Sequence, residues 1–229
     1  MREFDEIRPD NDCEVPEVIG RMIADNELID LLLEDLFSGA GKLLYPWLRP
    51  LLRARLRYTS RKIVTVDMLQ QHLATRLKTI LDQTTDGYSF SGLSGIENDK
   101  SYVFMSNHRD IALDPAITVL GLVESGRDSL RIAIGDNLLS KPFASDLMRI
   151  NRSFIVKRSV VARREKLKAL KILSNYIRQS VCNEGISIWI AQAEGRAKDG
   201  RDRTETALLK MLALSRSKDQ DFSSAINEL

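Results

Sequence analysis

The sequence predicts an α/β fold in which a mixed, partly parallel sheet is flanked by helices and preceded by a helical N-terminal region. Short apolar runs of strand length alternate with stretches of helical periodicity from residue 88 onward, and this alternation is typical of strands joined by helices. The residues before this point show helical periodicity instead. We therefore expect a helical N-terminal region over residues 1–87 and an α/β domain over residues 88–229.

The composition is that of a globular protein. Hydrophobic residues make up 43% and charged residues 29% of the 229 residues, enough apolar surface for a sizeable core. The formal net charge of +2 is close to balance, which argues against nucleic acid as a partner. Cys13 and Cys182 show no metal-ligand spacing, and we expect a reducing cytoplasm. The sequence shows neither a signal peptide nor the ~20-residue apolar run of a spanning helix.

The N-terminal region is predicted to be helical in several segments. An apolar stripe of helical spacing runs through residues 18–36, and Gly39 and Gly41 are expected to end it. A further helix is expected over residues 66–81, after which Asp86-Gly87 marks the turn into the second region.

The segment between these helices, residues 42–58, is basic and rich in leucine. Trp47 and two tyrosines, of which Tyr58 is the last residue, give it the composition of a helix that lies on an anionic lipid surface. Pro46 and Pro50 are expected to break or bend such a helix. The alternative is a helix that packs on the core and exposes its arginines to solvent.

The α/β domain is predicted to contain strands at four apolar runs. These runs cover residues 102–105, 130–134, 154–156 and 186–191, and the helices expected between them cover residues 115–123, 141–148 and 160–181. Runs this apolar predict strands that are buried, as in a largely parallel sheet.

Polar segments follow three of these strands, at residues 107–114, 135–138 and 192–203. In α/β folds the loops past the carboxyl ends of the strands form the ligand crevice, so we expect these segments to converge. The first segment contains His108, one of two histidines in the chain, with Asp114 soon after it. An imidazole held by a carboxylate is suited to remove a proton from a hydroxyl group.

Positive charge gathers in the third of these segments. The cations that follow Gly195 there are Arg196, Lys198, Arg201 and Arg203. Guanidinium groups bind phosphate through paired hydrogen bonds, so this loop predicts a phosphate cradle. A solvated charged loop is the alternative. A second basic cluster, which flanks the third strand, consists of Arg152, Lys157 and Arg158.

Together, these segments resemble the glycerophospholipid acyltransferase family over roughly residues 90–215. The first family motif, often Asn-His-Arg-Ser-x-x-Asp-Pro, is similar to Asn107-His108-Arg109 and Asp114-Pro115. The second motif of the glycerol-3-phosphate branch is similar to Gly135-Asp136-Asn137-Leu138, with Arg158 closing the next strand. The third motif resembles Glu194-Gly195-Arg196, and residues 190–200 resemble a bacterial subgroup named for 1-acylglycerol-3-phosphate acyltransferase.

The resemblance implies transfer of a fatty acyl group from acyl-CoA or acyl carrier protein to a hydroxyl of lysophosphatidate or glycerol-3-phosphate, in phospholipid synthesis. His108 would be the general base and Asp114 its partner, with Asp110 as the alternative partner. The residues implied to bind the acceptor phosphate are Arg158, Glu194, Gly195, Arg196, Lys198 and Arg203. Neither a metal nor a cofactor besides the thioester co-substrate is implied. We expect a cytoplasmic, membrane-associated protein, peripheral on the inner face of the cell membrane.

The chain departs from the family pattern at three points. Five residues rather than four separate His108 from Asp114. The third family motif is Glu-Gly-x-Arg, whereas here Arg196 directly follows the glycine. The apolar strand of a fourth motif does not follow, so we expect the domain to lack its last strand. Two alternative functions remain: a non-catalytic protein that binds the membrane surface or a lysolipid, and an acyltransferase for a non-glycerol acceptor such as an amino lipid.

Overall fold

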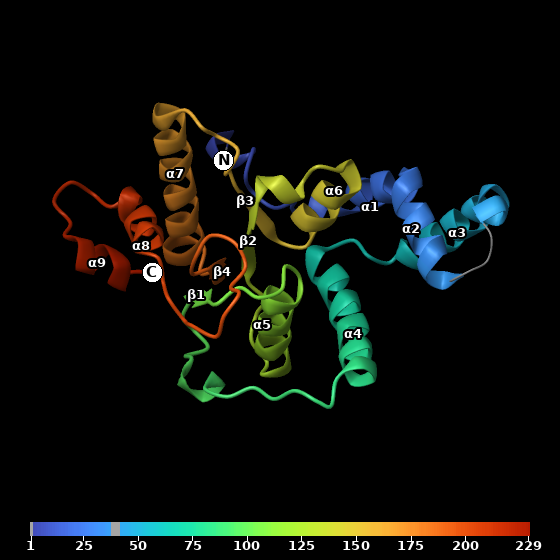
Figure 1. The fold of residues 1–229 in the computed structure, drawn as a ribbon, viewed down its shortest axis with the longest axis horizontal. Coiled ribbons are helices and arrows are strands. Elements are labelled where there is room, and N and C mark those ends of the chain that lie inside the picture. Colours follow the sequence, from blue (N-terminus) through green and yellow to red (C-terminus); the bar gives the residue numbers. More distant parts are fainter. Residues whose placement is uncertain (1, 38–41) are drawn as a thin grey trace. The chain divides into compact units, whose positions relative to one another are not determined.

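The computed structural model describes residues 2–37 and 42–229 and shows an α/β fold with helices toward its N-terminus (Figure 1). Its strands are β1 (Val103–Ser106), β2 (Arg131–Gly135), β3 (Ser153–Val156) and β4 (Ile188–Ala191). Its α-helices are α1 (Val15–Ala24), α2 (Asn26–Leu36), α3 (Tyr45–Ser60), α4 (Val66–Thr84), α5 (Leu113–Glu124), α6 (Pro142–Ile150), α7 (Arg163–Arg178), α8 (Thr206–Leu212) and α9 (Phe222–Asn227). The predicted fold class is confirmed. Gly39 and Gly41, expected to end the first apolar stripe, lie outside the described residues.

Contacts along the chain divide it into two compact units. The α/β unit contains residues 2–8, 76–137 and 153–229, and the helical unit contains residues 138–152 and the described part of residues 9–75. The chain therefore leaves the α/β unit twice, once after its first residues and once between β2 and β3.

The α/β unit is built on a sheet with the strand order β1-β4-β2-β3. Phe104 of β1 lies opposite Trp189 of β4, and Ala133 of β2 lies opposite Phe154 of β3. Every pairing among the described strands is parallel, so the sheet is more uniform than the mixed sheet expected from the sequence. All carboxyl ends therefore lie at one edge of the sheet, where the segments after the strands meet.

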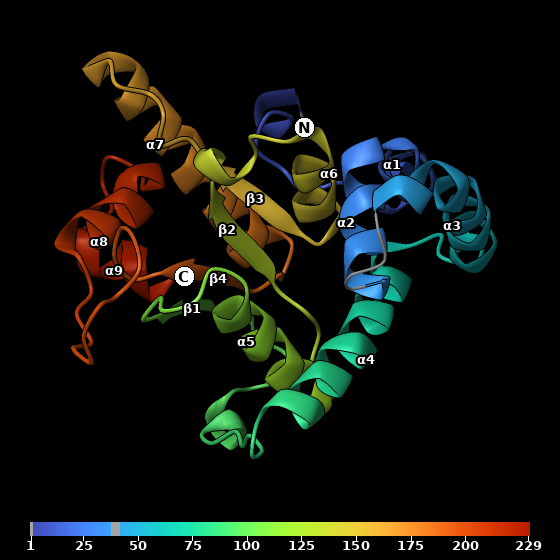
Figure 2. The ribbon, with the colours of Figure 1, turned by 45° about the vertical axis from the view of Figure 1, so that its right-hand side comes forward.

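Two helical connections cover the faces of this sheet. The chain steps from β1 to β2 through α5 and returns from β3 to β4 through α7, in opposite directions across the strands. Right-handed crossovers in opposite directions place their helices on opposite faces. Figure 2 shows α5 and α7 on two sides of the strands.

Apolar side chains fill the interior of the α/β unit. Fully buried members of this core include Leu130, Phe154, Ile177 and Ile188. The ring of Phe4 meets the ring of Tyr176 edge-on, with centroids 5.4 Å apart. The backbone N–H of Ile155 donates to the carbonyl of Ile7 at 2.9 Å. The N-terminal residues thus lie along the outer side of β3.

Two apolar clusters are found among the described residues of the helical unit. The first joins α1, α4 and α6 through Val15, Val18, Val66 and Ile150. The second joins α2 and α3 through Ile29, Leu33 and Tyr45, with Leu48, Leu52 and Leu56 packed against them. The carboxylate of Asp25 accepts hydrogen bonds from the backbone N–H groups of Glu27 and Leu28, at 2.8 and 3.0 Å. This N-cap starts α2 immediately after α1.

From Tyr45 onward the basic segment forms one continuous helix, α3. Its prolines were expected to break or bend the helix, and no break occurs. Pro46 lies in the first turn, where a backbone N–H would have no partner inside the helix. Pro50 lies inside the helix and removes one hydrogen bond. The packing of Leu48, Leu52 and Leu56 against α2 offsets this loss. No helix in the described parts of the chain combines the length and the apolar character needed to cross a membrane.

Candidate active site

His108 and Asp114 are in direct contact at the carboxyl end of β1. β1 ends at Ser106, two residues before the histidine, and α5 begins at Leu113, so Asp114 lies in its first turn. Nδ1 of His108 is 3.0 Å from a carboxylate oxygen of Asp114, and the same oxygen accepts the backbone N–H of Asp110 at 2.9 Å. Both side chains are about one-fifth exposed, 19% and 22%. Nε2 of His108 has no hydrogen-bond partner among the described residues and is available to a substrate.

Asp110, the alternative partner, has a different place in the structure. Its carboxylate accepts the backbone N–H groups of Ala112 and Leu113 at 2.9 and 2.8 Å and so caps the start of α5. These two hydrogen bonds, then the charges of Arg196 and His108, hold the pKa of Asp110 below its ordinary value. The structure brings Asp114 to the imidazole, and the catalytic role of either carboxylate stays a prediction.

Trp189 packs beside His108, a contact that the sequence analysis missed. It lies in β4, is 2% exposed, and its ring meets the imidazole edge-on with centroids 5.7 Å apart. Its indole N–H donates to the hydroxyl of Ser106 at 3.0 Å. Trp189 therefore forms one wall of the histidine site. The sequence offered one signal for this role, an aromatic residue in the very apolar run over residues 186–191. The run alone does not show that its strand lies beside the strand that leads to His108.

Gln192 closes the basic loop that follows β4, and this residue too was missed. It is 5% exposed, and its backbone N–H donates to the carbonyl of Ser106 at 3.0 Å. Its carbonyl accepts the backbone N–H of Glu205 at 2.9 Å, and its side-chain amide donates to Asp202. A buried polar side chain with these partners fixes both ends of the loop over residues 192–205.

This loop lies against the segment that carries His108. The backbone N–H of Ala197 donates to the carbonyl of His108 at 2.6 Å, and the guanidinium of Arg109 donates to the carbonyl of Asp199 at 3.2 Å. Gly195 has a φ of +81°, in the left-handed region that strains any residue with a side chain. The first and third predicted segments are thus brought together, as expected from the parallel sheet.

The charged side chains of this loop differ in their surroundings. Arg196, Lys198 and Arg203 are exposed, and none makes an ion pair within the described residues. Arg201 lies 4.0 Å from Asp199. The carboxylate of Glu194 is exposed and has no hydrogen bond within the described residues. The loop is held by Gln192 and Asp202.

Arg158 is placed by the turn after β2. The carboxylate of Asp136 accepts the backbone N–H groups of Arg158 and Ser159, both at 3.1 Å, and the Ser159 hydroxyl. Burial raises the pKa of Asp136, but these donors outweigh it and hold the pKa below its ordinary value. A Cβ added to Gly135 would lie 3.2 Å from Cδ and Nε of Arg158 and 2.3 Å from Oδ1 of Asn137. Arg158 therefore lies across the end of β2, and glycine leaves room for it.

The three cations of the second basic cluster, Arg152, Lys157 and Arg158, have separate surroundings. Lys157 pairs with Glu6 in the α/β unit, and Arg152 pairs with Asp67 in the helical unit. Arg158 is exposed and has no acidic partner among the described residues. It is the member of the cluster that remains available to an anionic ligand.

The strand order determines how the site residues follow one another along the sheet edge. His108 follows β1, the basic loop follows β4, Asp136 follows β2, and Arg158 follows β3. Parallel strands are about 5 Å apart, so the end of β2, which Arg158 overlies, is on the order of 10 Å from the end of β1. Arg196 lies in the loop between them.

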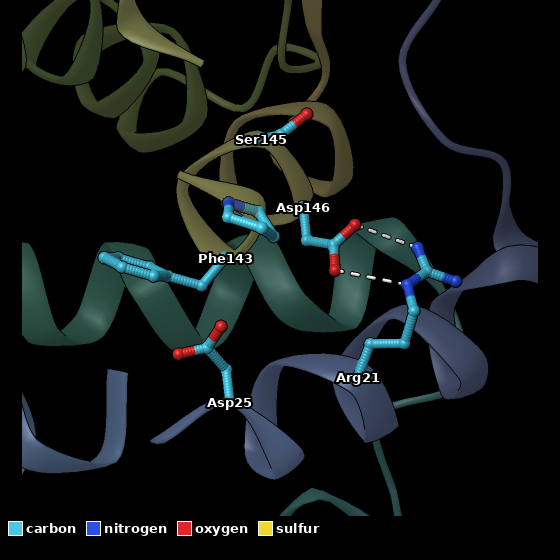
Figure 3. A pocket seen from close by; sticks show the side chains of 6 residues that line it. Arg21, Asp25, Phe143, Ser145 and Asp146 are labelled. Carbon is cyan, nitrogen blue, oxygen red and sulfur yellow. Dashed lines mark hydrogen bonds and ion pairs between the residues drawn. The ribbon is translucent and has the colours of Figure 1, made fainter. Parts of the chain in front are cut away.

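A small cavity of about 330 Å³ is present in the helical unit (Figure 3). It is lined by Arg21, Asp25, Pro142, Phe143, Ser145 and Asp146. The guanidinium of Arg21 makes a forked pair with Asp146, with distances of 2.9 and 3.2 Å. This arginine is therefore already neutralised, and none of the predicted site residues lines the cavity.

Comparison with known proteins identifies the family. A search of the curated proteins finds no match. The family model for acyltransferases matches residues 88–213, which is more than half of the chain and includes His108, Arg158 and the loop closed by Gln192. The chain therefore belongs to the acyltransferase family, the family of the glycerophospholipid acyltransferases.

Proposed function

We propose that this acyltransferase moves a fatty acyl group from a thioester, acyl-CoA or acyl carrier protein, to a hydroxyl of a glycerol phosphate, lysophosphatidate or glycerol-3-phosphate. The observation that carries the proposal is the 3.0 Å contact between Nδ1 of His108 and Asp114. This contact holds the imidazole in the tautomer with its proton on Nδ1, so Nε2 accepts a proton from substrate.

His108 is the general base of the proposed reaction. Nε2 takes the proton of the acceptor hydroxyl while the hydroxyl oxygen attacks the thioester carbonyl carbon. The tetrahedral intermediate collapses, the C–S bond breaks, and the proton passes from Nε2 to the departing thiolate. Asp114 stabilises the imidazolium that forms between these steps. The ester and the free thiol are the products.

Arg158 and Arg196 are the proposed ligands of the acceptor phosphate. Both are exposed cations without ion pairs among the described residues, on loops at the same sheet edge as His108. Guanidinium groups bind phosphate through paired hydrogen bonds. Lys198 and Arg203 lie in the same loop as Arg196 and are assigned a lesser part. Gly195 allows the backbone to approach the phosphate, and Glu194 is kept as a candidate beside it.

Acyl transfer by the purified protein and its His108→Ala variant tests the proposal. Acyl-CoA and acyl carrier protein serve as donors, and glycerol-3-phosphate, lysophosphatidate and an amino lipid serve as acceptors. The variant should lose about 10²–10⁴-fold in kcat because general-base catalysis contributes that much. His72→Ala is the matched control, because the other histidine of the chain is exposed in α4, and it should keep the wild-type rate.

The other outcomes identify the alternatives. Product formed only with the amino lipid would replace the glycerol phosphate acceptor. A folded wild-type protein that forms no product with any acceptor would refute acyl transfer and favour the lipid-binding alternative. Arg158→Ala should chiefly raise the acceptor KM, and an unchanged KM would remove Arg158 from the phosphate site.

A further inference from the structure

Helix α3 has two apolar faces, and one of them is covered. Leu48, Leu52 and Leu56 repeat every four residues and pack on Ile29 and Leu33 of α2. Figures 1 and 2 both show α2 and α3 side by side in the helical unit. This inner face accounts for the stability of the helix. It is the core-packing role that the sequence analysis offered as an alternative.

The outer face of α3 is also apolar but is exposed. Its large exposed side chains are Trp47 78%, Leu51 67% and Tyr58 73%, and the turn just before the helix adds Leu43 90% and Leu44 54%. Trp47, Leu51 and Tyr58 are four and seven residues apart, so they lie on one face of the helix. A helix needs only one apolar face to pack in a globular protein. An uncovered second face of this size is a mark of an interaction site.

The segment that carries this face is basic. Residues 42–62 contain seven lysines and arginines and no aspartate or glutamate. Arg49 pairs with Asp30 at 2.7 Å, and Arg53 donates to the carbonyls of Ile23 and Ala24 at the end of α1. Four exposed cations make no ion pair within the described residues: Arg55, Arg57, Arg61 and Lys62. They are available to anions outside the chain.

We propose that the outer face of α3 lies on an anionic lipid surface, with Trp47, Leu51 and Tyr58 inserted at the headgroup boundary. Tryptophan and tyrosine favour this boundary because each combines an apolar ring with a polar group. Arg55 lies one turn beyond Leu51, and Arg61 stacks on the ring of Tyr58 at 5.9 Å. Both cations therefore border the apolar face, where they meet lipid phosphates.

The same charges argue against the other occupants of this face. A second copy of the chain would bring two sets of unpaired cations together, and like charges at close range are unfavourable. The 16 residues of α3 extend about 24 Å along the helix axis. The exposed apolar side chains run along it from Trp47 to Tyr58, so the helix would lie in the plane of the surface.

Intrinsic fluorescence tests the proposal without an added label. The chain has two tryptophans: Trp47 is 78% exposed and Trp189 is 2% exposed. Adding phosphatidylglycerol vesicles should shift the emission to shorter wavelength and protect Trp47 from acrylamide, and Trp47→Phe should abolish both changes. Pure phosphatidylcholine vesicles and high salt should weaken binding, because exposed charges are screened.

Paired variants locate the surface. Leu43→Gln with Leu51→Gln should lower the partition coefficient for vesicles at least tenfold, because the variant lacks two apolar side chains that would be transferred from water into the lipid. Val161→Gln with Leu167→Gln is the matched control, since these side chains are 92% and 58% exposed in the α/β unit. It should bind as wild type. Circular dichroism of each variant verifies the helices.

A charge pair completes the test. Arg55→Gln with Arg61→Gln should weaken binding roughly 30-fold, and the exposed pair Arg163→Gln with Arg164→Gln at the start of α7 should not. Equal losses from both pairs, or vesicle binding without a change in Trp47 emission, would overturn the proposal. So would a dimer that Leu43→Gln and Leu51→Gln dissociate. His108→Ala should bind as wild type, so this surface stands or fails separately from acyl transfer.

Discussion

Gly135→Ala tests whether Arg158 is held across the end of β2. The added methyl group would lie 3.2 Å from the Arg158 stem and 2.3 Å from Oδ1 of Asn137. The amide of exposed Asn137 must turn away, and the arginine stem must shift by a few tenths of an ångström. The substitution therefore moves the guanidinium without removing it.

The expected magnitude follows from this difference. A hydrogen bond to a charged group contributes about 1.5–3 kcal/mol, so Arg158→Ala should raise the acceptor KM by roughly tenfold to hundredfold. In Gly135→Ala the Arg158 guanidinium is displaced but still present, so part of its interaction with the phosphate is retained. This variant should therefore raise the KM by a smaller factor, with kcat nearly unchanged. Overpacking should also cost about 1–3 kcal/mol of unfolding free energy.

Steady-state kinetics over a range of glycerol-3-phosphate concentrations measures the effect, and chemical denaturation measures stability. Gly20→Ala is the matched control, because it makes the same chemical change in α1 where nothing lies within 4 Å of the new Cβ. The double variant Gly135→Ala, Arg158→Ala should have the KM of Arg158→Ala alone. If the two increases multiply instead, the glycine does not act through Arg158 and the reasoning is refuted.

Three further predictions concern the rest of the α/β unit. Asp114→Asn should lower kcat about 10²–10⁴-fold by releasing the imidazole, whereas Asp110→Ala should cost about 1 kcal/mol of stability as a lost cap; the reverse pattern in kcat would make Asp110 the partner. Gln192→Ala should raise the acceptor KM and speed tryptic cleavage in the loop that holds Arg196, and unchanged proteolysis would show that other bonds fix the loop. Burial raises the pKa of Tyr176 to about 12, so the folded state holds its proton more tightly and stability should fall between about pH 10 and pH 12. The loss is about 3 kcal/mol from a shift of two units. Tyr176→Phe keeps the ring and should remove that slope in thermal denaturation, and an unchanged slope would assign it to other groups.

Local pattern was sufficient for most of the fold. The strands and the long helices appear where the apolar runs and helical stripes predicted them, because burial on both sides of a strand or on one side of a helix leaves a periodic trace. Pro50 does not break α3, although a break was one of the two effects that the proline rule, which considers the helix alone, allowed. The contact of α3 with α2 is a tertiary interaction that local pattern does not contain.

The site shows a similar division. Residue types and order directed attention to His108, Asp114 and the basic loops, since these carry the chemistry. Spacing alone left Asp110 and Asp114 as alternatives, because the start of α5 at Leu113 decides which carboxylate turns toward the imidazole. Trp189 and Gln192 acquire their roles from the pairing of β1 with β4. That register joins residues about 85 positions apart and has no local signature.

The strand order also constrains how the protein is made. Among the described strands, β1 hydrogen-bonds to β4 alone, and β4 is the last to leave the ribosome. At roughly 5–20 residues per second, β1 emerges several seconds before its neighbour. Strand β1, which leads into His108, is therefore without its neighbouring strand in the nascent chain and is open to chaperones or to aggregation. Insertion of β4 between β1 and β2 joins the described strands into one sheet and, in the same step, brings the basic loop onto the histidine.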